Sequence, residues 1–284
     1  LMSLVDRSCW EDLTAIHGIG MKIAEFAPKM RGDFAKWLLT KTDEEGWDKR
    51  YVYDCLIDVN KEGKAALAHF EDSGIWDKVE VVVGREIAKL APSRGVSFTE
   101  WLLKKSKEKE WGKNWVHKCL MGKYGGATAY EQLNLADSAD WDKVSEVVGI
   151  NIAQLAPTMG AEFSEWLLTK TDEKGWAKKR VYGHLVEEVE EGRTALSHFS
   201  DEKVWKKVEA ELGVHIVGAA TTMGDEFLEW LLIQCHQKRW WKDNQMLLRK
   251  GLTKKNKDGK SAYDRLNLLG SSCWNRLSEG LGVN

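Results

Sequence analysis

Tryptophan recurs along this chain with a period of about 65 residues, and that spacing constrains the fold more than any other feature. The 284 residues include 15 tryptophans, of which 13 fall into three periodic series. The first series runs through Trp10, Trp76, Trp141, Trp205 and Trp274. The second runs through Trp37, Trp101, Trp166 and Trp230, and the third follows shortly behind it at Trp47, Trp111, Trp176 and Trp240. Self-similarity at a nearly constant period of this length indicates a tandem repeat protein.

Other residue types keep the same period. A phenylalanine stands three residues before each tryptophan of the second series, at Phe34, Phe98, Phe163 and Phe227. We therefore divide the chain into four helical repeats, at residues 10–75, 76–140, 141–204 and 205–273, with residues 274–284 as the start of a fifth. Because the chain begins and ends at the same phase of the repeat, we expect it to come from a longer array.

A larger period lies above this one. Residues 37–47 read WLLTKTDEEGW and residues 166–176 read WLLTKTDEKGW, whereas the second and fourth repeats share TAYEQLNL at 128–135 and SAYDRLNL at 261–268. This alternation indicates that a block of two repeats has been duplicated.

The apolar pattern within each repeat is helical. After Trp76, the residues Val79, Val83 and Ile87 follow a spacing of three to four. Ser97 and Glu100 have the spacing of a capping box, which predicts a helix that begins after Ser97. A repeat this small buries little apolar surface alone, so its neighbours must stack against it. We predict an all-α fold, a tandem array of four repeats of four helices each, stacked into an elongated superhelix.

Composition and motifs exclude several function classes. The net charge is −2, from 42 basic and 44 acidic residues, which argues against a dedicated nucleic-acid binder. No apolar run approaches the roughly 18 residues of a membrane span. The five cysteines form no CxxC pair, and no Walker A, HExxH, GxSxG or EF-hand motif occurs. We expect no enzymatic activity, no metal, no cofactor and no membrane association.

The periodic aromatic residues favour a structural role. A tryptophan that recurs on an apolar helix face beside Phe and Leu belongs to a core far more often than to a ligand cage. We assign sixteen residues to the repeat core: Trp10, Trp37, Trp47, Trp76, Trp101, Trp111, Trp141, Trp166, Trp176, Trp205, Trp230, Trp240, Phe34, Phe98, Phe163 and Phe227.

Two tryptophans lie outside the three series. Trp115 stands near Lys113, and Trp241 stands between Arg239 and Lys242. An exposed aromatic ring among cations is typical of an interface hot spot. We therefore take these five residues as candidates for binding a partner.

Two alternatives remain open. Residues 13–24, LTAIHGIGMKIA, resemble a helix-hairpin-helix, whose Gly18–Gly20 turn would aim backbone N–H groups at a phosphate. The equivalent segments lack the first glycine, so divergence of the repeat is the better explanation. With the basic stretches 104–123 and 238–260, this turn supports nucleic-acid binding as the alternative function. The second alternative is a purely structural array that spaces other domains.

The repeat resembles the tandem WY and LWY modules of oomycete host-translocated effectors. The resemblance rests on residues 223–232, MGDEFLEWLL, and residues 69–79, HFEDSGIWDKV, with Tyr130 and Tyr263 at the module's tyrosine position. Phe70 and Phe199 replace that tyrosine in the other repeats.

This resemblance implies a monomeric virulence protein, secreted by a pathogen, that acts in the cytoplasm or nucleus of the host plant cell. Its expected partner is a host protein, since members work by binding host proteins and some tandem members capture a host phosphatase core enzyme. No RxLR string is visible, and we expect the targeting segment to lie outside this chain.

Overall fold

The computed structural model describes residues 7–15, 19–30, 32–60, 65–124, 126–133, 135–188, 192–256 and 258–266. Within these ranges the chain forms sixteen α-helices, six 3-10 helices and two strands of two residues each, so the predicted all-α class is confirmed. None of the described helices is both long and apolar enough to cross a membrane. The chain divides into an N-terminal unit, residues 1–149, and a C-terminal unit, residues 150–284.

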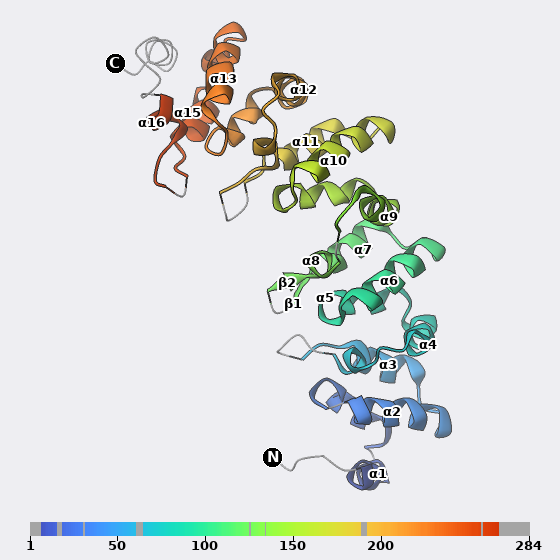
Figure 1. The fold of residues 1–284 in the computed structure, drawn as a ribbon. Helices are drawn as coiled ribbons and strands as arrows, with labels where there is room; N and C mark the ends of the chain where they lie inside the picture. The colour runs from blue at the N-terminus through green and yellow to red at the C-terminus, as the bar shows by residue number, and fades with distance from the viewer. Residues whose placement is uncertain are drawn as a thin grey trace. The chain divides into compact units, whose positions relative to one another are not determined.

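The N-terminal unit contains the helices α1 to α9 (Figure 1). Its elements are α1 (Arg7–Ala15), η1 (Gly20–Lys29), α2 (Gly32–Glu44), α3 (Lys49–Ile57), η2 (Ala66–His69), α4 (Ser73–Val83), η3 (Gly84–Leu90), α5 (Ala91–Arg94), α6 (Val96–Glu108), α7 (Lys113–Leu120), β1 (Lys123–Tyr124), β2 (Ala127–Thr128), α8 (Ala129–Gln132) and α9 (Ser138–Val148). The strands β1 and β2 form an antiparallel pair. In Figure 1, α1 and α4 are viewed nearly along their axes, while α2 and α6 run across the view. Helix α1 therefore crosses α2 steeply, and α4 crosses α6 steeply.

The C-terminal unit has a similar order of elements. Its elements are η4 (Gly149–Thr158), α10 (Ala161–Glu173), α11 (Lys178–Leu185), η5 (Ala195–His198), α12 (Glu202–Leu212), η6 (Gly213–Ala219), α13 (Asp225–Gln237), α14 (Trp240–Asp243), α15 (Gln245–Thr253) and α16 (Ala262–Leu266). The tryptophan Trp274 and the predicted start of a fifth repeat lie outside the described residues.

Local sequence sets the ends of the helices that carry the first tryptophan series. Asp72 and Asp201 precede α4 and α12, and each carboxylate accepts a hydrogen bond from the backbone N–H two residues on, at 2.8 Å. Gly84 and Gly213 end the same helices with φ of +59° and +56°, a region that favours glycine. A 3-10 helix follows each glycine, so the helix is redirected at the point where the sequence predicts an interruption.

The capping box predicted at Ser97 and Glu100 is wrong. Helix α6 begins at Val96, so Ser97 already lies in its first turn, and no side chain caps it. The cause is Gly95, which has a φ of +84° and whose carbonyl oxygen accepts from the backbone N–H of Thr99 at 3.2 Å. Capping boxes occur instead in the shared AY motifs of the second and fourth repeats, at Thr128–Glu131 and Ser261–Asp264.

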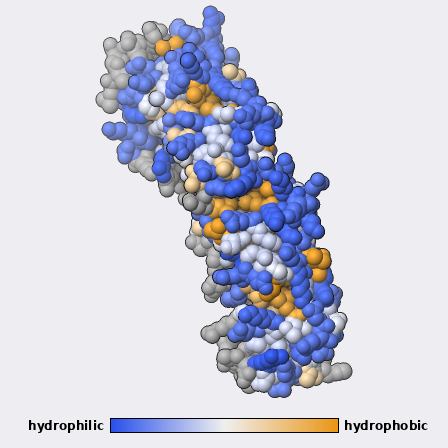
Figure 2. Space-filling model, turned by 45° about the vertical axis from the view of Figure 1, so that its right-hand side comes forward, coloured by the Kyte–Doolittle hydropathy of each residue, from blue (hydrophilic) through white to orange (hydrophobic). Residues whose placement is uncertain are grey.

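The predicted core residues fall into two groups. All four phenylalanines are at most 1% exposed, and the tryptophans Trp10, Trp37, Trp76, Trp141, Trp205, Trp230 and Trp240 are also buried. The remaining five are half-buried: Trp47, Trp101, Trp111, Trp166 and Trp176. On the face shown in Figure 2, hydrophilic side chains predominate and hydrophobic ones form separate patches.

The half-burial of Trp47 and Trp176, in the third series, has a geometric cause. The backbone N–H of Trp47 donates to the carbonyl of Thr42 at 3.1 Å, and that of Trp176 donates to Thr171 at 3.0 Å. Each tryptophan follows a glycine of positive φ, Gly46 or Gly175. This is the Schellman arrangement, in which the residue after the glycine closes the helix and packs back on its last turn. These rings therefore cover a helix end with one side open to solvent.

Candidate partner-binding sites

Trp115 is half-buried on α7 and is held by the preceding 3-10 helix, η3. Its indole N–H donates to the carbonyl oxygen of Arg85 at 3.2 Å. The Arg85 guanidinium lies 5.2 Å from the ring centroid, and the Lys89 ammonium lies 5.9 Å from it. The cations that accompany this ring therefore come from η3, and the indole already uses its polar atom within the chain.

Lys113 does not share this environment. It stands two residues before Trp115, and residues at that spacing on a helix point in different directions. Its Cδ lies 3.2 Å from the place that a Cβ on Gly149 would occupy, so its stem runs along the end of α9. The structure thus separates Lys113 from Trp115, and the predicted pair does not form one patch.

Trp241 lies on the short helix α14, between two of its predicted companions. The ring is half-buried and contacts His236 of α13, with ring centroids 5.1 Å apart. Arg239 caps α14 in the left-handed conformation, with a φ of +53°, and Lys242 is exposed. Met246, on the next helix, is 85% exposed. Residues 239–247 therefore place one half-buried aromatic ring, two cations and two exposed apolar side chains, Met246 and Leu247, on a short segment, which we call the α14 surface.

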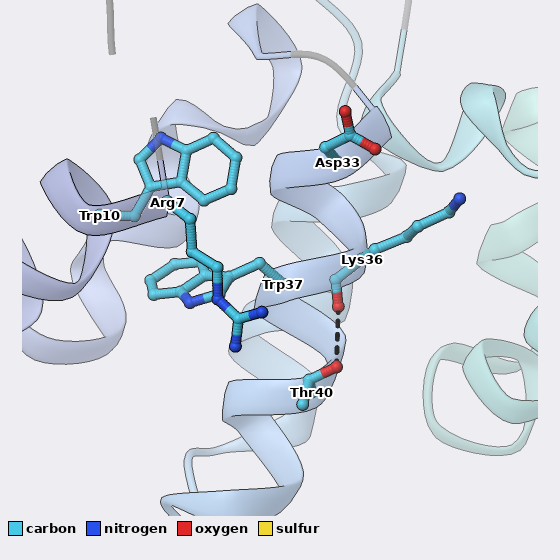
Figure 3. Close-up of a pocket in the computed structure, with 6 residues that line it drawn as sticks. All are labelled: Arg7, Trp10, Asp33, Lys36, Trp37 and Thr40. Carbon is cyan, nitrogen blue, oxygen red and sulfur yellow. Dashed lines mark hydrogen bonds between the residues drawn. The ribbon is translucent and has the colours of Figure 1, made fainter. Parts of the chain in front are cut away.

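Sequence reasoning missed two surface grooves, one in each unit. The first has a volume of about 430 Å³ and lies between α1 and α2. Figure 3 shows its six lining residues, of which Arg7 and Trp10 come from α1 and the others from α2. The second, of about 580 Å³, lies between α12 and α13, and its lining includes Trp230. Trp37 and Trp230 occupy the same place in the sequence repeat, so the two grooves form at equivalent positions.

Trp37 and Trp230 each carry an indole N–H that finds no hydrogen-bond acceptor among the described residues. The equivalent Trp101 donates instead to a carboxylate oxygen of Asp77 at 3.2 Å. Glu11 and Lys206 stand where Asp77 stands, one residue after the first-series tryptophan. Glu11 pairs with Arg7 at 3.2 Å, and a lysine ammonium accepts no hydrogen bond. The sequence signal that could have revealed the grooves is the presence of Glu11 and Lys206 at the position that Asp77 holds in the second repeat.

The two grooves differ in charge. Arg7, Asp33 and Lys36 line the first, which gives it a net positive rim. Four glutamates and two lysines line the second: Glu202, Glu209, Glu226, Glu229, Lys206 and Lys238. Lys238 contacts Glu209 at 2.6 Å and Lys206 contacts Glu202 at 2.8 Å, whereas Glu226 and Glu229 form no ion pair with another described residue. The second groove is therefore net acidic.

The residues of the nucleic-acid alternative are partly engaged elsewhere. Gly18 lies outside the described residues, and Gly20, with a φ of +38°, begins η1. In the basic stretch 104–123, Lys105 contacts Asp77 at 2.8 Å and Lys107 contacts Glu146 at 2.6 Å. These ion pairs reduce the positive charge available to a phosphate backbone.

Three of the described cysteines, Cys55, Cys119 and Cys235, are not activated nucleophiles. Burial raises the pKa of the Cys55 and Cys119 thiols to about 11 and that of Cys235 to about 12. Such thiols stay protonated at neutral pH, and the thiolate is the reactive form. The part of the chain that the structure describes also holds no cluster of three His, Cys, Asp or Glu side chains placed to bind a metal ion.

Comparison with known proteins adds no identification. No family model, no curated protein and no solved structure matches this chain.

Proposed function

We propose that this chain is a non-enzymatic protein-binding scaffold. In this proposal its four repeats of about 65 residues stack into an elongated superhelix, the recurring aromatic residues hold the repeats, and the side chains that vary from repeat to repeat select the partner. The resemblance to WY and LWY modules favours a host protein inside the plant cell as the partner, with a phosphatase as one example.

One observation carries the proposal: the aromatic cluster has the same geometry in three repeats, whereas the side chains on the surface above it differ between repeats. The first-series ring lies 5.1 Å from phenylalanine in the pairs Trp10–Phe34 and Trp76–Phe98, and 5.2 Å from it in Trp205–Phe227. The same rings lie 5.6, 5.6 and 5.7 Å from the second-series tryptophan. Above this cluster, the grooves carry opposite net charge. A fixed core with variable outer residues is how repeat proteins acquire different partners.

The test is capture of a specific protein, followed by measurement with the purified pair. The chain is cross-linked in plant extract, the captured protein is identified and purified, and its Kd is measured by isothermal titration calorimetry. We expect the double change Trp241→Ala and Lys242→Glu to raise the Kd at least tenfold, because it removes a hot-spot ring and reverses a charge. Lys179→Glu, a charge reversal at an exposed residue of α11, serves as the matched control.

Two results would overturn the proposal. One is the absence of any protein that binds the purified chain. The other is a mobility shift of DNA or RNA at low salt that weakens steeply as salt rises, since that dependence is typical of phosphate-backbone binding. If the protein partner binds but the double variant binds it equally well, the α14 surface is wrong while the scaffold proposal stands.

A further inference from the structure

We infer that the groove between α12 and α13 binds a basic, extended segment of the partner, in which a backbone carbonyl accepts the Trp230 indole N–H and Lys or Arg side chains meet Glu226 and Glu229. This inference rests on the proposed protein-binding function and names the chemistry of the segment that is bound. We refer to this site as the acidic groove, lined in part by Glu202, Lys206, Glu226, Glu229, Trp230 and Ile233.

The first support is the unmatched donor. Trp230 is only 6% exposed, and its Nε1 is buried without a hydrogen-bond partner in the described part of the chain. A buried donor without a partner is costly, and native structures rarely retain one without a reason. Trp101 shows how the same ring is satisfied when an acceptor is supplied, because its N–H donates to Asp77. In the acidic groove, a ligand carbonyl would supply the acceptor that Lys206 cannot.

The second support is the access to that donor. Lys206 stands at the sequence position of Asp77 and lines the same groove. It is held by an ion pair with Glu202 whose side chains are 60% and 53% exposed. Ion pairs this exposed are weak, so Lys206 can leave its place at little cost. A cation of the incoming segment would then replace Lys206 beside Glu202.

The third support is the charge of the rim. Glu226 and Glu229 lie on α13 without an ion-pair partner among the described residues, and Glu209 is already matched by Lys238. Ile233, one turn beyond Glu229, is 43% exposed and offers an apolar contact. Two free carboxylates, an apolar side chain and a buried donor fit a peptide that carries Lys or Arg and an available backbone carbonyl.

The equivalent groove of the N-terminal unit provides an internal comparison. It contains the same kind of unmatched donor, on Trp37, but its rim carries Arg7 and Lys36. Asp33 is the one acid among its lining residues, and Arg7 pairs with Glu11, so this groove lacks the two free carboxylates that a basic segment would meet in the acidic groove. Charge and not the indole alone therefore decides which segment each groove takes.

The experiment observes the indole protons directly. The intact chain is labelled with ¹⁵N-tryptophan and titrated with an end-capped octapeptide of alternating lysine and alanine. Trp230→Phe identifies the Trp230 signal, and glutamate in place of lysine gives the control peptide. We expect the Trp230 indole proton to move downfield saturably with the lysine peptide, as formation of a hydrogen bond requires. The Trp101 signal should stay in place, because that donor is already bound by Asp77.

Two variants make the inference refutable without loss of the fold. Glu226→Gln with Glu229→Gln changes exposed side chains only and should raise the Kd of the lysine peptide about tenfold. Lys206→Asp should move the Trp230 indole proton downfield in the absence of peptide, since it restores the acceptor found at Asp77. The inference is overturned if the peptide leaves the Trp230 signal unchanged, if the glutamate peptide moves it equally, or if the double variant binds as the wild type does.

These outcomes are separable from failure of the proposed function. If the captured protein binds the wild type while the lysine peptide does not move Trp230, the scaffold proposal stands and the acidic groove is not its contact.

Discussion

Truncation of Trp76 tests whether the recurring tryptophans hold the fold, and its cost can be worked from the structure. The side chain is 3% exposed, and a buried tryptophan removes about 150–250 Å² from water. At about 25 cal/mol per Å², this burial contributes about 4–6 kcal/mol. Its indole N–H also donates to the Phe70 carbonyl at 3.0 Å, a bond that contributes about 1 kcal/mol. Because neighbours relax into part of the space, we expect Trp76→Ala to lower the free energy of unfolding by about 3–5 kcal/mol.

Two further variants separate the ring from its hydrogen bond. Trp76→Phe keeps an aromatic ring beside Phe98, whose centroid lies 5.1 Å away, and removes only the donor and part of the area. We expect it to cost about 1–2 kcal/mol. Val81→Ala, on the same helix, is the control, because Val81 is 78% exposed and its truncation should change the free energy by less than about 0.5 kcal/mol.

The assay is urea unfolding followed by far-ultraviolet circular dichroism, with the free energy extrapolated to zero denaturant. A loss of several kcal/mol is a large share of the roughly 5–15 kcal/mol that stabilises a domain. If Trp76→Ala unfolds within about 1 kcal/mol of the wild type, the reasoning that assigns these rings to the core is refuted.

Three further predictions concern backbone, charge and thiol chemistry. Glu110 holds a φ of +51° where Gly46 stands in the first repeat, so Glu110→Gly should raise the free energy of unfolding by about 1 kcal/mol in urea titrations, and Gly46→Ala should lower it. Hydrogen bonds from Lys78 and Lys49 lower the pKa of the Asp43 carboxyl, so its stabilising effect is present above the unfolded pKa and is lost as pH falls through the folded pKa. Asp43→Asn should therefore lower the urea midpoint at neutral pH and leave it unchanged in acid, below both pKa values; equal loss at both would exclude the ionic explanation. Cys119, with a pKa of about 11, should react slowly with a thiol reagent at pH 8 and rapidly in urea, and fast labelling at Cys119 itself in the folded chain, as located by mass spectrometry, would contradict its burial.

The sequence predicted the helical class because the apolar spacing of three to four is a local signal. It also predicted which aromatic residues are buried wherever those residues lie on the inner face of a helix, as Phe34 and Trp76 do. It did not predict that Trp101, Trp111 and Trp166 are only half-buried. The same holds for Trp47 and Trp176, which period alone cannot distinguish from the buried rings. Their half-exposure depends on the left-handed glycine before each ring, and that conformation turns the ring over the helix end.

The grooves were missed for a different reason. Whether an indole N–H is satisfied depends on a residue in another helix, at Asp77 or Lys206, about 24 positions earlier in the chain. The sequence shows that Lys206 stands at the position of Asp77, but it does not show that the side chain at this position lies beside the indole N–H. The separation of Lys113 from Trp115 was equally hidden, because two residues close in sequence face different neighbours on α7.

Ion pairs join successive segments of the sequence repeat and differ from one segment to the next. Asp43 accepts from Lys78 at 2.5 Å, and Asp172 accepts from Lys207 at 2.6 Å, so the first and third repeats each present an acid to the lysine of the next. At the equivalent position the second repeat has Lys107, which contacts Glu146 at 2.6 Å. The third repeat has Lys143 where Lys78 and Lys207 stand, so Lys107 pairs with a different position of the next repeat. These exposed pairs contribute little stability, since such pairs are typically worth about 0–1 kcal/mol. What differs between these junctions is therefore the sign and position of the charges, which bears on specificity more than on stability.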